Sequence, residues 1–447
     1  MAFLTSPSAT YLVQLVVQNV KPFRGRHVLD LRTPKGKPAR WTLILGENGV
    51  GKTSLLECMA ATVPRLNVDD STGERRTFLE AAGVIDDVMI EKLARHGNVE
   101  VEIRATYAKN DRLDASGRKA KTFDVGFRFS RSPDGEVFEP ITADESRVDE
   151  PLVLSYSAGR RMGVGNLDGR STVDAPGLFS EERDLVDAEE LILQLDYAAL
   201  KRGTKVAARQ RDTFLDMLAS MLPNVGSRQN FSIYGPTPIG RRHKSGVFVK
   251  VPYGEVHLRQ LSFGYQTMLG WLADMAWRLF SHYPNSPNPM RESAIVLVDE
   301  VDLHLHPRWQ RELPQLLATH FPAVQFIATA HSPLMAQASM DQNLAVVQPK
   351  DDTVEIVNEP GVVENWRIDQ VVASSLFGMG PWSPQVEALL EEQGRLANKT
   401  KPTAAEKSRL KKLEQSSMAL PTGLPPALDS AVDIIRRAAA ALQGPQA

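Results

Sequence analysis

The sequence predicts an α/β fold built around a mainly parallel sheet. Its short β-type runs, among them residues 41–45 and 293–300, are largely apolar and lack the polar alternation of a half-exposed strand. Several of these runs lead into segments whose apolar residues have helical spacing, and such alternation of strand with helix is typical of parallel sheets. We therefore expect buried strands with helices covering the sheet.

The first third of the chain is predicted to be rich in strands. Residues 11–31 indicate a hairpin with its turn over 21–26, and the apolar run at 41–45 ends in a glycine. A helix is expected over 52–61, and mixed, mainly helical structure over 69–98. Further strands are expected at 99–107, 122–130 and 151–159.

The character of the chain changes after residue 159. Residues 159–177 are rich in Gly, Arg and Ser and predict a loop. Residues 180–202 open with a serine cap and acidic residues, and their leucines then have helical spacing. The other expected elements are helices over 204–222 and 258–283, a helix from His306, strands at 246–251, 323–333, 344–348 and 353–357, and a charged helical tail from Ser383 that a Pro-rich linker at 420–428 interrupts.

Composition restricts the class of protein. The chain has 447 residues, of which 42% are hydrophobic, and this length is enough for more than one lobe. Its single cysteine, Cys58, cannot form an intramolecular disulfide, so a cytoplasmic setting is expected. We see neither a signal peptide nor an apolar run of about 18 residues, and we expect a soluble protein without a membrane partner.

The formal net charge of −2 argues against a surface that binds nucleic acid everywhere. Local basic clusters occur at residues 201–211, 241–244 and 399–412, and each could contact a phosphate backbone. Solvated helix faces are the commoner explanation for such clusters. Nucleic acid therefore stays open as a partner.

The strongest chemical motif is GENGVGKTS at residues 46–54. It follows an apolar strand and opens a helix, as a phosphate-binding loop requires. The glycines allow backbone N–H groups to face phosphates, Lys52 would reach the β- and γ-phosphates, and the Thr53 hydroxyl would bind Mg²⁺. The sequence thus predicts ATP and Mg²⁺ as cofactors. The residues expected to bind ATP are Glu47, Asn48, Gly49, Val50, Gly51, Lys52, Thr53 and Ser54.

Two further segments carry candidate site residues. IVLVDE at residues 295–300 is a buried strand that ends in two carboxylates, of which Asp299 would bind the metal and Glu300 would polarise the attacking water. LSFGYQ at 261–266 places Ser262 and Gly264 at the start of a helix, where N–H groups and the helix dipole favour an anion. Taken alone, LSFGYQ would favour a serine-capped core helix.

The order of these motifs resembles that of an ATP-binding-cassette ATPase. His331, at the end of the strand in FIATAHSP, completes the series and resembles the switch histidine that contacts the γ-phosphate. The opening strands with NVKPFRG and the stretch DEVDLHLHPRWQ at 299–310 are similar to RecF, SMC and OLD-type ATPases. Within that stretch Val301 and Asp302 replace the usual proline and glutamate.

The resemblance implies an α/β ABC-type ATPase head with a mixed or parallel sheet core and a helical C-terminal extension. Between them, a helical lobe would carry the signature motif of the family, which corresponds to LSFGYQ at 261–266 in this sequence. The resemblance further implies that two protomers sandwich ATP, so that Ser262 and Gly264 of one protomer contact the γ-phosphate bound by the other. Lys52, Glu300 and His331 would be the catalytic residues, and Thr53 and Asp299 the metal ligands. The expected divisions are residues 1–158, 159–290, 291–360 and 361–447.

Two smaller features allow more than one interpretation. Arg160 and Arg161 in SYSAGRR could meet phosphate or nucleic acid, although two arginines in a loop are more often solvated. His304 and His306 could suggest a metal, but without a third ligand nearby a structural use is favoured.

No second catalytic centre can be read from the sequence, because neither a TOPRIM-type cluster of acids nor an HNH, Cys–His or Ser–His arrangement is present. Residues 366–396 resemble a segment of bacterial antiviral ATPases, including those of Septu and retron systems that pair with an HNH nuclease. That resemblance implies an ATPase that controls a separate effector such as a nuclease or toxin. The alternatives are a RecF-like repair ATPase that clamps DNA as a dimer and, less favoured, a transporter ATPase.

Overall fold

The computed structural model describes most of residues 9–417. The described residues are 9–68, 75–78, 93–95, 100–109, 121–132, 135–141, 150–162, 178, 184–202, 205–222, 224–235, 244–339, 342–358, 370–371, 377, 382–399 and 402–417. They fall into two compact units, residues 1–365 and 366–447. No helix among them is long and apolar enough to cross a membrane.

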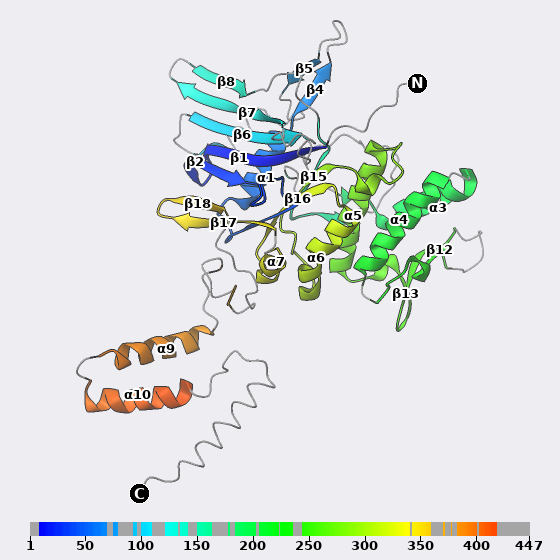
Figure 1. Cartoon of the computed structure of the whole chain (residues 1–447). Coiled ribbons are helices and arrows are strands. Elements are labelled where there is room, and N and C mark those ends of the chain that lie inside the picture. Colours follow the sequence, from blue (N-terminus) through cyan, green and yellow to red (C-terminus); the bar gives the residue numbers. More distant parts are fainter. Residues whose placement is uncertain are drawn as a thin grey trace. The chain divides into compact units, whose positions relative to one another are not determined.

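A six-stranded mixed sheet forms the centre of the first unit (Figure 1). Its order is β18-β17-β3-β16-β15-β9, and every neighbouring pair is parallel except β17 with β18. β3, β15 and β16 are buried along their whole length, which explains why their sequences are apolar without alternation. The strands are β3 (Trp41–Leu45), β9 (Val153–Tyr156), β15 (Ala294–Val298), β16 (Val324–Ala330), β17 (Asn343–Lys350) and β18 (Thr353–Asn358).

A second sheet of five antiparallel strands lies over one face of the central sheet, and helix α1 (Lys52–Ala61) lies between the two. Leu12 and Ile103 of the outer sheet, Leu55 of α1 and Ile327 of the central sheet belong to one buried cluster. This burial anchors the helix that follows the phosphate loop. The outer strands are β1 (Thr10–Val20), β2 (Phe23–Asp30), β6 (Glu100–Lys109), β7 (Lys121–Ser132) and β8 (Gly135–Ile141), in the order β2-β1-β6-β7-β8.

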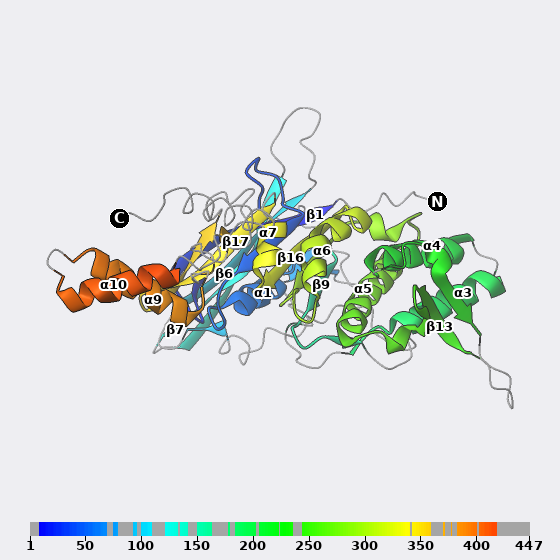
Figure 2. The ribbon, with the colours of Figure 1, turned by 90° about the horizontal axis from the view of Figure 1, so that it is seen from below.

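Helices α6 (Pro307–His320) and α7 (Pro333–Ala338) lie against the other face of the central sheet (Figure 2). Each begins with a proline at its first position, where a missing N–H costs no helix hydrogen bond. His306 caps α6 by accepting from the backbone N–H of Arg308, and Ser332 caps α7 by accepting from Leu334. Both caps follow strands of the central sheet, so they fix the loops at its carboxyl edge.

The middle of the chain forms a lobe of three helices and a small sheet. Leu269, Trp271 and Leu272 of the central helix of this lobe are fully buried, and the small sheet is antiparallel. The helices are α3 (Ala188–Arg202), α4 (Lys205–Met221) and α5 (Phe263–His282), and the strands are β12 (Phe231–Tyr234), β13 (Gly246–Val251) and β14 (Gly254–His257). Short parallel strands β10 (Arg161–Met162) and β11 (Asp184–Leu185) pair at its margin, and the 3₁₀ turns η2 (Arg228–Asn230), η3 (Leu258–Gln260) and η4 (Pro289–Arg291) complete it.

The described part of the second unit contains helices α9 (Pro384–Ala397) and α10 (Ala404–Ser417). Ser383 is the N-cap residue of α9, so this helix begins where the helical tail was predicted to begin. Arg409 of α10 forms an ion pair with Glu392 of α9 at 2.9 Å. The linker at 420–428 and the part of the predicted helical tail that follows it lie outside the described residues.

Two local predictions were wrong. The helix expected to start near Ser180 begins at Ala188, because the preceding residues 184–185 form β11 and Asp187 accepts a hydrogen bond from the N–H of Glu189. Residues 75–78, within the segment expected to be mainly helical, form strand β5 (Arg75–Phe78), which pairs with β4 (Arg65–Val68). The strand predicted at 246–251 is confirmed as β13, the central strand of the small sheet of β12 to β14.

Candidate functional site

The parallel strands of the central sheet end at one edge, where the predicted site residues gather. In register, Val298 of β15 lies opposite Tyr156 of β9 and Ala328 of β16, and Ala330 of β16 lies opposite Leu45 of β3. The carboxyl ends of these strands therefore lead side by side into the phosphate loop, the carboxylate turn (residues 299–304), the segment around His331 and the turn before Arg160. Ligands bind at this edge in open α/β sheets.

The phosphate loop needs glycine for two physical reasons. Gly49 and Gly51 have φ angles of 82° and 96°, which side chains other than glycine rarely adopt. A Cβ atom on Gly51 would lie 2.6 Å from Pro22 Cγ, and one on Gly46 would lie 2.3 Å from the carbonyl oxygen of Val347. The loop thus packs closely against Pro22 and the backbone of Val347. Helix α1 starts directly after it, so the first N–H groups of the helix face the loop.

Lys52 folds back over this loop. Its Nζ donates hydrogen bonds to the carbonyl oxygens of Gly46 at 2.9 Å and Glu47 at 2.7 Å. Burial lowers the pKa of the Lys52 ammonium, and the nearby carboxylates of Asp299, Glu300 and Asp302 act in the opposite direction. The positive charge of Lys52 therefore lies within the electrostatic reach of the carboxylate turn.

Asp299 links the phosphate loop to the central sheet. Its Oδ2 accepts a hydrogen bond from Thr53 Oγ1 at 2.9 Å, and its Oδ1 accepts one from Thr329 Oγ1 at 2.6 Å. The side chain is buried. A hydroxyl and a carboxylate oxygen at this separation are the donor set that Mg²⁺ takes from phosphate-loop proteins, so the residues present fit that ion.

Glu300, the second residue of the carboxylate turn, has an unusual backbone conformation. Its φ angle is 46°, in the left-handed region that non-glycine residues seldom occupy. Its N–H donates to Thr329 Oγ1 at 2.7 Å, so Thr329 supports both acidic residues. A strained backbone that several contacts hold in place is typical of functional sites.

His331 follows β16 and is tied to the carboxylate turn. Its backbone N–H donates to Asp302 Oδ2 at 3.0 Å. Asp302 therefore ties the backbone of residue 331 to the turn that carries Glu300. The structure brings together Lys52, Thr53, Asp299, Glu300 and the backbone of His331.

Arg160 is not a solvated loop arginine, which was the favoured of its two interpretations. Only 5% of the residue is exposed, and its guanidinium donates to the carbonyl oxygens of Asp299 at 2.5 Å, Glu300 at 2.8 Å and Ser157 at 3.0 Å. Burial lowers the pKa of Arg160 to about 10. Its place just after β9, at the edge where the strands end, was the signal in the sequence that could have identified it.

Within the described residues, Ser262 and Gly264 form no hydrogen bond with the phosphate loop of their own chain. Ser262 is the exposed N-cap residue of α5, and its side chain makes no capping hydrogen bond. Both views show α5 separated from α1 (Figures 1 and 2). Gly264 instead lies against the carboxylate turn, because a Cβ atom on it would be 2.3 Å from the carbonyl oxygen of His304. The ring of Phe263 meets the His304 ring edge-on at 5.0 Å.

The change Gly264→Ala should therefore destabilise the protein by about 1–3 kcal/mol, the usual cost of inserting a methyl group into a filled space. Urea unfolding measures this change. Gly235→Ala in the same lobe is the matched control, because a Cβ atom on Gly235 would have no neighbouring atom within 4 Å. Equal unfolding midpoints for the two variants would contradict the close packing of Gly264 on His304.

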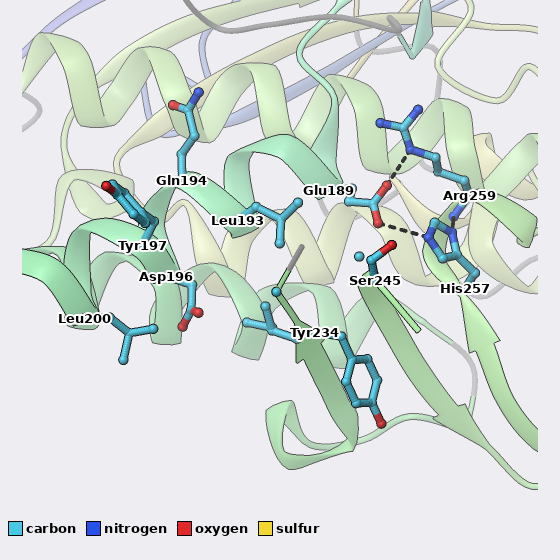
Figure 3. Close-up of a pocket in the computed structure, with 13 residues that line it drawn as sticks. Glu189, Leu193, Gln194, Asp196, Tyr197, Leu200, Tyr234, Ser245, His257 and Arg259 are labelled. Carbon is cyan, nitrogen blue, oxygen red and sulfur yellow. Dashed lines mark hydrogen bonds and ion pairs between the residues drawn. The ribbon is translucent and has the colours of Figure 1, made fainter. Parts of the chain in front are cut away.

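A cluster of ion pairs, called the strut below, holds the turn at residues 259–262 that leads into α5 (Figure 3). Arg259 pairs with Asp187 and Glu189 at the start of α3, and Glu189 Oε1 also lies 3.1 Å from His257 Nε2. Gln266 Nε2 donates to the carbonyl oxygen of Leu261 at 2.7 Å. These contacts fix residues 259–262 to the lobe. The strut forms one wall of a groove of about 960 Å³ that also includes Leu193, Tyr197, Leu200 and Tyr234.

The two histidines considered as metal ligands have structural contacts. His304 meets the Phe263 ring, and His306 caps α6. Within the described residues, no group of three or more His, Cys, Asp or Glu is placed to hold a metal ion.

Fold and site together define a nucleotide-binding α/β protein of the phosphate-loop class, and comparisons with known families agree. Residues 14–150 match the model of an AAA domain, and residues 175–336 match that of an "AAA domain, putative AbiEii toxin, Type IV TA system". Each match covers about a third of the chain.

The chain is related to the Septu PtuA proteins and to retron ATPases. It is 23% identical over 415 residues to Septu protein PtuA of Bacillus mycoides, which covers 90% of this chain and 50% of that protein. It is 38% identical over 97 residues to the retron Vc95 probable ATPase of Vibrio cholerae, which covers 22% of this chain and 19% of that protein. The chain thus matches half or less of the length of these two relatives.

Among solved structures, the SMC head domain from Thermotoga maritima aligns with a TM-score of 0.39 and 16% identity. The alignment covers 78% of this chain and 98% of that domain.

Proposed function

We propose that this protein is a Mg²⁺-dependent ATPase whose two protomers sandwich ATP and whose nucleotide state controls a separate effector. The ATPase proposal rests mainly on the hydrogen bond between Thr53 and Asp299 close to Lys52. It supports the proposal because the hydroxyl, carboxylate and ammonium that would bind metal and phosphate lie at one strand edge. The test is ATP hydrolysis by the purified chain with and without Mg²⁺.

In this proposal each residue has one task. The backbone of Glu47, Asn48, Gly49, Val50 and Gly51 surrounds the phosphates, together with Lys52 and the start of α1 at Thr53 and Ser54. Thr53 and Asp299 bind the metal, which when bound neutralises charge on the phosphates. Glu300 accepts a proton from the attacking water, and His331 contacts the γ-phosphate.

The exposure of Ser262 at the start of α5 supports the proposed sandwich of ATP between two protomers. Ser262 is exposed at the start of a 20-residue helix whose first N–H groups favour an anion, and in both views this helix, α5, lies apart from α1, the helix that follows the phosphate loop. A second copy of the chain can bring this surface to the phosphates. Dimerisation would then complete the active site.

The change Ser262→Arg should leave ATP binding by the monomer intact and block the sandwich, since a long charged side chain would occupy the dimer surface. We expect ATP hydrolysis to fall at least about 100-fold, as when a transition-state donor is removed. Titration calorimetry and sedimentation in ATP measure binding and dimerisation separately. Ser281→Arg, exposed near the other end of α5, is the matched control. Full activity of Ser262→Arg would refute the contact between protomers.

We also propose that the chain serves bacterial antiviral defence, with residues 361–447 binding the effector. The support is its relationship to proteins named as Septu and retron components, together with a separate unit from residue 366 onward. The divisions at residues 158, 290 and 360 belong to this proposal. Co-purification of the full chain with the product of the neighbouring gene tests it. Salt-sensitive DNA binding without any such partner would favour the RecF-like alternative.

A further inference from the structure

A buried arginine outside the expected ATPase machinery holds the turn that carries Glu300. Arg160 Nη1 donates to the carbonyl oxygen of Asp299 and its Nη2 to that of Glu300. The two oxygens belong to consecutive residues, so the planar guanidinium forms hydrogen bonds to two adjacent peptide groups of the turn. Each contact bridges about 140 residues of sequence.

The surroundings of Arg160 show that its role is not ordinary ion pairing. The described hydrogen bonds of its guanidinium are to backbone oxygens, which leaves the carboxylates of Asp299 and Glu300 available to other groups. Its Nε is buried without a hydrogen-bond partner. Burying a charge and leaving one donor unpaired is costly, so stability alone gives little reason for this residue.

The turn itself requires such support. Glu300 has a φ angle of 46°, a conformation that an isolated chain would populate only rarely. Thr329 holds the N–H of Glu300 from one side, and Arg160 holds its carbonyl oxygen from the other. With both peptide groups of Glu300 fixed, the direction of its side chain is restricted.

We propose that Arg160 is a positioning residue for ATP hydrolysis, which fixes the Asp299–Glu300 turn so that the Glu300 carboxylate is directed at the attacking water. This inference rests on the proposed ATPase function. Arg160 acts through the turn and need not touch the nucleotide. Its loss should therefore reduce the rate of hydrolysis and leave nucleotide affinity nearly unchanged.

The test compares Arg160→Met and Arg160→Lys in the full-length protein. Methionine fills the buried space without a charge, and lysine keeps the charge without the two-pronged geometry. For both we expect kcat to fall about 100-fold, the usual loss when one preorganised donor is removed, with KM and the calorimetric Kd for ATP changed less than about threefold. Recovery of kcat by lysine would overturn the proposal, because charge alone would then suffice.

A second measurement does not depend on hydrolysis. Amide hydrogen exchange in the nucleotide-free protein should speed up at residues 299–304 in both variants and stay unchanged in β3. Arg40→Met is the matched control, since Arg40 is a partly buried arginine over the Tyr11 ring at the opposite end of β3. Unchanged exchange in the turn, or parallel loss of ATP binding and hydrolysis, would overturn the proposal. If the wild type binds ATP but never hydrolyses it, the proposed ATPase function is wrong. The hydrogen-exchange result still decides whether Arg160 holds the turn.

Discussion

Glu300→Gln should bind ATP as the wild type does and lose hydrolysis by a factor of about 10² to 10⁴, the contribution typical of a general base. The amide has the shape of the carboxylate but cannot accept a proton from water. Because the backbone contacts of residue 300 to Thr329 and Arg160 involve no side-chain atom of Glu300, the turn should persist. Stopped hydrolysis should make a nucleotide-bound dimer accumulate, which light scattering with ATP measures.

Glu312→Gln provides the control for this prediction. Glu312 is an exposed residue of α6 that pairs with Arg308 at 3.0 Å, so losing its charge should alter neither hydrolysis nor assembly. Exposed pairs of this kind contribute little to stability. A Glu300→Gln protein that hydrolyses ATP at the wild-type rate would remove Glu300 from its proposed role, whatever its assembly state.

Lys52→Ala should weaken ATP binding by about 100-fold or more, which corresponds to the roughly 3 kcal/mol of a strong hydrogen bond to a charged group. Lys52 Nζ is held by the carbonyl oxygens of Gly46 and Glu47 in the loop. Its removal also takes away the positive charge that faces Asp299 and Glu300. Isothermal titration with ATP and Mg²⁺ measures the loss directly.

The control for Lys52 is Lys37→Ala, because Lys37 is exposed in the turn before β3 and outside the phosphate loop. It should bind ATP with wild-type affinity. Unaltered affinity in Lys52→Ala would mean that the loop at residues 46–54 does not bind the phosphates. Thermal unfolding of both variants shows whether either change disturbs the fold itself.

Sequence patterns predicted the parts of the fold that depend on neighbouring residues. Helix α1 covers the expected residues 52–61, and the strands before and after the site lie where apolar runs indicated them. A strand-loop-helix motif is local, so its glycines and its lysine can be recognised without knowledge of the rest of the chain.

What the sequence did not predict depends on contacts between distant segments. Arg160 resembles a solvated loop arginine until β9 pairs with β15 and brings it under the carboxylate turn. The late start of α3 has a similar cause, since residues 184–185 pair with β10 and Asp187 meets Arg259. Neither partner can be identified from spacing along the chain.

The seating of Gly264 on His304 has a mechanical consequence. With no room for even one methyl group between them, the first turn of α5 and the carboxylate turn cannot slide past each other. We therefore expect a displacement of the carboxylate turn to be transmitted to the first turn of α5, whose N-cap residue is Ser262. In the proposed dimer, the surface that Ser262 offers to the second protomer would therefore move together with the turn that carries Glu300, so that nucleotide binding and dimerisation would be coupled.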